Sequence, residues 1–142
     1  MDYSFLIIPF LVLISSQALK LATDGIKGNF DFKNFLISYG GMPSSHTSFS
    51  ASITTLIGLR QGFDSPLFAA CLVFTLLVIR DATSFRNLLG RQAQIFNKFI
   101  ETLPVKDKKS IKKFRERIGH TYMEVFGGLI WGILLTFYLS IL

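Results

Sequence analysis

The chain has 142 residues, of which 50% are hydrophobic and 17% charged, with a formal net charge of +6 at pH 7. This length allows one domain, and the apolar content is too high for a soluble domain of this size, so the composition indicates a membrane protein. A single cysteine excludes an internal disulfide, and two histidines without a second cysteine argue against a zinc site.

The first apolar stretch, 3–22, is long enough to cross a bilayer and is nearly free of charge until Lys20. It has neither a basic leader nor a small-residue cleavage site, so we expect a retained span and not a signal peptide. Residues 23–39 mix charged and aromatic side chains, which indicates a loop with a short interfacial or re-entrant piece. The second span, 44–60, is rich in serine and threonine, which predicts a helix enclosed in a bundle.

A third apolar span, 65–80, begins with a capping serine and a proline. Apolar residues then recur at helical spacing over 83–103 with basic residues between them, which predicts an amphipathic helix at the membrane surface or packed on the bundle. A dense basic segment, 106–117, leads into the last apolar span, 118–142, which carries a glycine-rich face.

These ranges predict an all-α fold: an integral membrane helical bundle with about four transmembrane helices plus an amphipathic surface helix, in a single membrane domain over 1–142. Four spans place both termini on one side of the membrane. Fourteen of the fifteen Lys and Arg residues then lie on the opposite side, and Arg60 alone lies on the side of the termini. By the positive-inside rule, the basic side is cytoplasmic and both termini are non-cytoplasmic.

The stretch from Gly40 to Thr47 is the first candidate for chemistry. Two glycines free the backbone and Pro43 stops any upstream helix, while Ser44 and Ser45 open the next one. A helix start presents unpaired N–H groups that suit a phosphate, and His46 in the first turn could donate a proton to a phosphate ester. A capped helix with an incidental histidine is the alternative, and this motif alone does not choose between them.

The second candidate is the pair His120 and Glu124, which at i and i+4 are expected to share one helical face. A carboxylate bonded to one imidazole nitrogen fixes the tautomer and leaves the other nitrogen free to attack. The alternative is an ordinary stabilising pair at a membrane boundary. The predicted topology favours a site, because it brings ionisable residues from distant segments to one face: Lys20, Lys27, His46, Asp81, Arg86, His120 and Glu124.

Three ordered motifs run from Gly40 to His46, from Asp81 to Arg86 with Gly90 to Ala93 following, and from Gly119 to Val125. In these motifs the chain resembles a small divergent branch of the type 2 phosphatidic acid phosphatase superfamily, the acid phosphatase/vanadium haloperoxidase-related proteins. The resemblance spans essentially the whole chain.

The resemblance implies a role for each matching residue. His120 would be the nucleophile that forms a phosphohistidine, Glu124 would orient it, and His46 would be the general acid. Basic residues and hydroxyls would hold the phosphate oxygens: Lys20, Lys27, Ser44, Ser45 and one of Arg86, Arg115 and Arg117. Asp81 would either hold a basic residue of this site or simply pair with a neighbouring arginine at a helix end. No metal and no cofactor is implied.

The expected function is therefore a membrane-embedded phosphatase that hydrolyses a lipid or isoprenoid phosphate at the cytoplasmic face. The alternative is an inactive lipid-phosphate binding or transport module of the same fold, because the arginine of the superfamily's third signature has no match in register here. We expect the basic segment 106–117 to contact anionic lipids and do not expect nucleic-acid binding. The serine-rich and glycine-rich helix faces indicate a homodimer.

Overall fold

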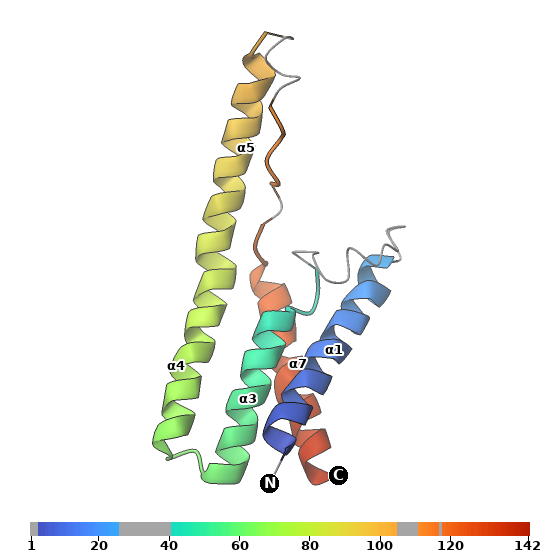
Figure 1. The fold of residues 1–142 in the computed structure, drawn as a ribbon, viewed down its shortest axis with the longest axis vertical. Helices are drawn as coiled ribbons and strands as arrows, with labels where there is room; N and C mark the ends of the chain where they lie inside the picture. The colour runs from blue at the N-terminus through green and yellow to red at the C-terminus, as the bar shows by residue number, and fades with distance from the viewer. Residues whose placement is uncertain (1–2, 26–40, 105–110, 117) are drawn as a thin grey trace.

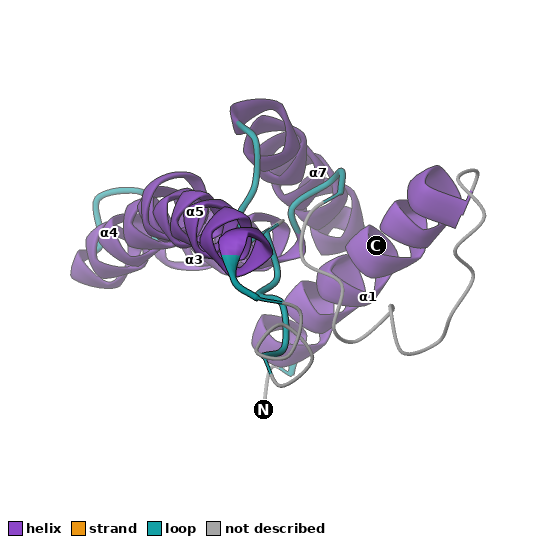
Figure 2. Ribbon diagram, turned by 90° about the horizontal axis from the view of Figure 1, so that it is seen from above, coloured by secondary structure: helices purple, strands orange, loops and turns teal. Residues whose placement is uncertain are grey.

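The computed structural model describes residues 3–25, 41–104, 111–116 and 118–142, and these form helices and connecting segments without a strand (Figure 2). The helices are α1 (Ser4–Gly25), α3 (Ser45–Gln61), α4 (Pro66–Arg80), the π-helical turn η1 (Asp81–Phe85), α5 (Arg86–Thr102) and α7 (Tyr122–Ile141). The predicted all-α membrane bundle is confirmed. The expected re-entrant piece, Lys27, Arg117 and half of the basic segment lie outside the described residues.

Three stretches of helix are long and apolar enough to cross a membrane: Ser4–Ala22, Pro66–Thr102 and Tyr122–Ile141. The fourth helix of the bundle, α3, is enclosed by packing against α1, α4 and α7 (Figure 1). Most of its serines and threonines are buried, and their hydroxyls donate hydrogen bonds mainly to backbone carbonyls one turn earlier. This is how a polar helix is accommodated inside a membrane protein, where an unpaired hydroxyl would be costly.

Small residues let α7 approach α3 closely. A side-chain carbon added at Gly128 would lie 2.5 Å from the carbonyl oxygen of Ser44, and one at Gly132 would lie 2.5 Å from that of Ser48. One turn further on, the Thr136 hydroxyl donates a 2.6 Å hydrogen bond to the Ser52 hydroxyl. The faces from which the sequence indicated a homodimer are therefore packed against each other within one chain.

The α4, η1 and α5 segments form one continuous helix of 37 residues, drawn in Figure 1 as a column that projects beyond the rest of the bundle. The sequence predicted a span ending at residue 80 and a separate surface helix, and this separation is wrong. Neither proline nor glycine interrupts residues 81–89, so nothing breaks the helix there. Arg86 pairs with Asp81 across the π-helical turn, where residues five apart come into register (Nε to Oδ2, 2.6 Å).

An extended segment leads back from the far end of α5 to the start of α7, and we call its described residues, 111–116 and 118–121, the strap (Figure 1). Asn97 of α5 holds the strap as a strand would, because its side chain accepts from the Phe114 N–H and donates to the Phe114 carbonyl, both at 2.8 Å. Gly90 leaves room for the strap, since an added side-chain carbon would lie 2.6 Å from the Glu116 carbonyl oxygen. The strap ends at Thr121, directly after His120.

Candidate active site

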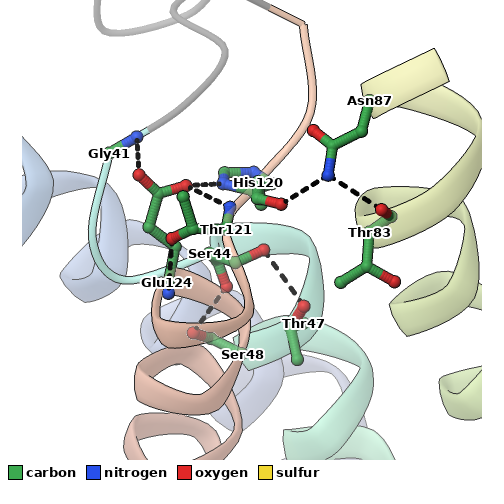
Figure 3. A network of polar contacts seen from close by, with 9 residues as sticks. All are labelled: Gly41, Ser44, Thr47, Ser48, Thr83, Asn87, His120, Thr121 and Glu124. Carbon is green, nitrogen blue, oxygen red and sulfur yellow. Dashed lines mark hydrogen bonds and ion pairs between the residues drawn. The ribbon is translucent and has the colours of Figure 1, made fainter.

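His120 lies near the end of the strap, with only Thr121 between it and α7, and the residue is only 4% exposed. Its N–H donates to the Ala82 carbonyl (3.1 Å), and its carbonyl accepts from the Asn87 side chain (3.1 Å), which also donates to Thr83 (Figure 3). Gly119 precedes it with φ +107°, and a side-chain carbon there would lie 2.4 Å from the Asn87 Oδ1. The backbone of His120 is thus fixed against η1 and α5, and the position before it requires glycine.

The Glu124 carboxylate accepts three hydrogen bonds in a cluster that Figure 3 shows from close by. Its Oε2 lies 2.9 Å from Nδ1 of His120 and 3.1 Å from the Thr121 N–H, and its Oε1 lies 3.2 Å from the Gly41 N–H. Because an ionised carboxylate only accepts, Nδ1 carries the proton and the lone pair of the neutral ring lies on Nε2. The free nitrogen is the one that a nucleophile needs.

The sequence predicted that His120 and Glu124 share one helical face, and this prediction is wrong. The last helix begins at Tyr122 and not at 118, so His120 lies outside it. Thr121 caps the helix and Glu124 reaches back to it in a reciprocal capping box. That turn brings the carboxylate over the imidazole.

The start of α3 is bonded directly to α7. The Ser44 N–H donates to the Glu124 carbonyl (2.9 Å), while the Ser44 hydroxyl accepts from the Thr47 hydroxyl (3.0 Å). Among the described residues, the Ser45 hydroxyl is buried and has no hydrogen-bond partner. The first turn of α3 therefore lies beside the His120–Glu124 pair and carries one hydroxyl whose hydrogen-bonding capacity is unused.

A cavity of about 250 Å³ brings the two histidines together. Its wall combines His46 of α3, His120 of the strap, and Asp81 and Arg86 across the π-helical turn, with apolar side chains of α4 completing it. The charges of Arg86, Lys20 and Asp81 act on the His46 ring, which places the buried Lys20 of α1 near the same site. Residues from α3, α4, η1, α5 and the strap thus line this cavity.

Asp81 makes the ion pair with Arg86 while both line the cavity. The sequence left open whether Asp81 holds a basic residue of the site or pairs with a neighbouring arginine. Both descriptions apply to its contact with Arg86. Arg115 is exposed on the strap and lines neither this cavity nor the larger one beside it. Of the arginines proposed from sequence, Arg86 is the one that reaches the cavity within the described part of the chain.

A second cavity, of about 430 Å³, lies between α5 and the strap and shares His120 with the first. Asn87, Arg91 and Gln94 line it from α5, and sequence reasoning assigned none of them a role. The motif from Gly90 to Ala93 was the available indication, but it was used only for the family resemblance and as part of an amphipathic helix. His120 therefore borders two cavities, one toward α3 and α4 and one along α5.

Fold and cavity together define a helical integral membrane protein in which two histidines, a carboxylate and basic residues from distant segments meet at one end of the bundle. The chain belongs to the divergent PAP2 family, whose sequence model matches residues 1–135. It is 34% identical over 139 residues to a protein of Bacillus subtilis (strain 168) named "Uncharacterized membrane protein YuiD", and this similarity covers 90% of the chain and 88% of the relative. No solved structure matches the chain significantly. The family predicted from the three motifs is confirmed.

Proposed function

We propose that the protein is a phosphatase embedded in the membrane, which hydrolyses a lipid or isoprenoid phosphate monoester through a phosphohistidine intermediate. The observation that carries this proposal is the cavity shared by His46, His120 and Arg86, with Nδ1 of His120 bonded to the Glu124 carboxylate. Membership of the divergent PAP2 family supports the same class of reaction.

In the first step, Nε2 of His120 attacks phosphorus, the bond to the ester oxygen breaks, and protonated His46 gives its proton to the leaving alcohol. In the second step, water attacks the phosphohistidine, its proton passes to His46, and inorganic phosphate leaves. Phosphoryl transfer depends on positioning and on stabilising charge at the equatorial oxygens, so Arg86 and Lys20 supply positive charge where it is needed. Glu124 stabilises the charge that His120 gains on attack.

Two observations support a lipid substrate at the cytoplasmic face. Leu77 and Val78 of α4, within a stretch apolar enough to span a membrane, form one wall of the cavity, so a hydrocarbon chain could extend from the phosphate into the bilayer. The strong excess of basic residues on the side of the cavity supports a cytoplasmic orientation. Anionic lipids would be held there by the basic segment 106–117, at about 1 kcal/mol per basic residue.

The direct test is release of inorganic phosphate by purified protein from phosphatidate, phosphatidylglycerophosphate and polyprenyl phosphate. We expect turnover of at least one substrate, inhibition by vanadate, and loss of turnover in His120→Ala and His46→Ala. Brief reaction with ³²P-labelled substrate should trap an acid-labile, base-stable phosphoenzyme in the wild type but not in His120→Ala. Turnover unchanged in His120→Ala would contradict the proposal.

The alternative function, an inactive module that binds or transports a lipid phosphate, is favoured by one observation. The Nε of Arg86 is already engaged by Asp81, which reduces the positive charge available for a transition state. Binding of a phosphate lipid that survives His120→Ala, without any turnover in the wild type, would support this alternative.

A further inference from the structure

The helix formed by α4, η1 and α5 is too long for the membrane that it crosses. Its 37 residues correspond to about 55 Å at 1.5 Å per residue, whereas the hydrocarbon core of a bilayer is about 30 Å thick. About 20 residues suffice to cross it, so a helix that begins at Pro66 leaves the hydrocarbon near Arg86. Most of α5 therefore lies outside the hydrocarbon core.

The surface of α5 has three faces. The first is covered by the strap and consists of its buried residues, Gly90, Ala93, Asn97 and Ile100. The second is polar and exposed and includes Arg91, Gln94 and Lys98. The third face begins at Phe85, the last residue of η1, and we call it the apolar seam. Exposed Gln92 lies within it, and its six large side chains are between 53% and 69% exposed: Phe85, Leu88, Leu89, Ile95, Phe96 and Phe99. Outside the hydrocarbon, such a surface needs a covering partner.

The spacing of the seam matches that of helices that pair. Phe85, Leu88, Gln92, Ile95 and Phe99 follow one another at alternating steps of three and four residues, which is the pattern of a coiled-coil seam. The six large side chains expose roughly 100 Å² each, hence about 600 Å² per chain. Two copies would bury about 1,200 Å² in total, the lower end of the range for specific interfaces.

We propose that two copies of this chain pair in parallel through the apolar seam, about a two-fold axis along the membrane normal. All copies insert into the membrane in the same orientation, so their α5 helices project on the same side and point the same way. A parallel pair places each seam residue opposite its own counterpart. Gln92 then faces Gln92, and two amides can hydrogen-bond each other and fix the register.

The membrane surface itself is the other possible cover, and the fold argues against it. To lie on the lipid, α5 would have to turn through roughly a right angle from α4, whereas the two helices are continuous (Figure 1). The seam therefore faces sideways, toward a neighbouring helix. This dimer is also distinct from the one that the sequence indicated, because the serine-rich and glycine-rich faces are already occupied within the chain.

Cysteine cross-linking in native membranes tests the proposal, and the single native cysteine makes it clean. In a Cys71→Ser background, Ile95→Cys lies in the seam and Gln94→Cys lies one position away on the polar face, and both side chains are exposed. Mild oxidation should convert Ile95→Cys to a disulfide-linked dimer at least tenfold faster than Gln94→Cys. Equal rates in the two variants, or no dimer in either, would overturn the proposal.

The mass of the purified protein gives an independent measurement. Light scattering in a mild detergent should give a dimer for the wild type and for Gln94→Lys, but a monomer for Ile95→Lys combined with Phe99→Lys. Circular dichroism and melting in the same detergent verify that each variant is folded. A wild-type monomer, or a spin label at position 95 that contacts lipid and not a second label, would refute pairing through the seam.

Discussion

Replacement of Glu124 by glutamine is the sharpest test of the candidate site. The wild-type carboxylate accepts from three groups, His120 Nδ1, the Thr121 N–H and the Gly41 N–H, and glutamine has one accepting oxygen. If that oxygen faces Gly41, the amide donates to His120, and the ring takes the tautomer with its proton on Nε2. If it faces His120, the Gly41 N–H loses its acceptor. Both orientations sacrifice a contact, at about 1–3 kcal/mol of stability.

The first orientation removes the lone pair from Nε2, the nitrogen that we propose attacks phosphorus. An asparagine that imposes the wrong histidine tautomer in a catalytic triad costs about 10⁴-fold in kcat, and we expect a loss of the same order here. Phosphate release under saturating substrate measures kcat, and ¹⁵N NMR of labelled histidine reports the tautomer. Glu101→Gln is the matched control, because Glu101 is an exposed partner of Lys113 and lines neither cavity. A Glu124→Gln protein with wild-type kcat although His120 carries its proton on Nε2, or one with both wild-type kcat and wild-type stability, would refute the reasoning.

Three further outcomes follow from the structure. Gly132→Ala should destabilise the fold in detergent by about 1–3 kcal/mol because its new methyl group meets the backbone of α3, whereas Gly127→Ala, which meets only a flexible methionine, should be near neutral in the same melts. Arg86→Ala should lower phosphate release by about 100-fold, with Arg86→Lys recovering part of it. The hydrogen bond to Glu101 raises the pKa of Lys113 above its ordinary 10.5 in the folded protein. The stabilisation by this pair is therefore fully present below pH 10.5 and is lost as the pH rises through the raised pKa of the folded state. Any difference in melting temperature between wild type and Lys113→Met should accordingly be largest at neutral pH and should shrink as the pH rises past 10.5.

The sequence was sufficient for the class of fold, because long apolar stretches and a polar, small-residue helix leave few arrangements in a bilayer. The prediction from sequence failed at the junction of α4 and α5, where the adjacent charged residues Arg80 and Asp81 were interpreted as a helix end. A charge does not break a helix as proline does, and Asp81 and Arg86 neutralise each other across the π-helical turn. Periodicity could not reveal that turn, since one extra residue shifts the phase without changing the composition.

The sequence selected several residues that the structure brings together, but it did not predict how they are arranged. Side-chain types and order pointed to His46 and His120, and the structure gives both rings one cavity. What the sequence could not supply is the path of the strap, since an extended segment held by Asn97 and Gly90 has no periodic pattern to detect. For the same reason the approach of Asn87 to the His120 carbonyl was missed.

The glycine spacing in α7 is better explained by the site than by association of chains. Gly128 allows the α3 backbone to approach so closely that the Ser44 N–H bonds to the Glu124 carbonyl. That bond ties the helix bearing His46 to the turn that holds His120. A bulkier residue at 128 would push apart the two helix starts, and with them the two imidazoles, without touching either ring. The close packing of α3 against α7 and the juxtaposition of the histidines therefore depend on the same few small side chains.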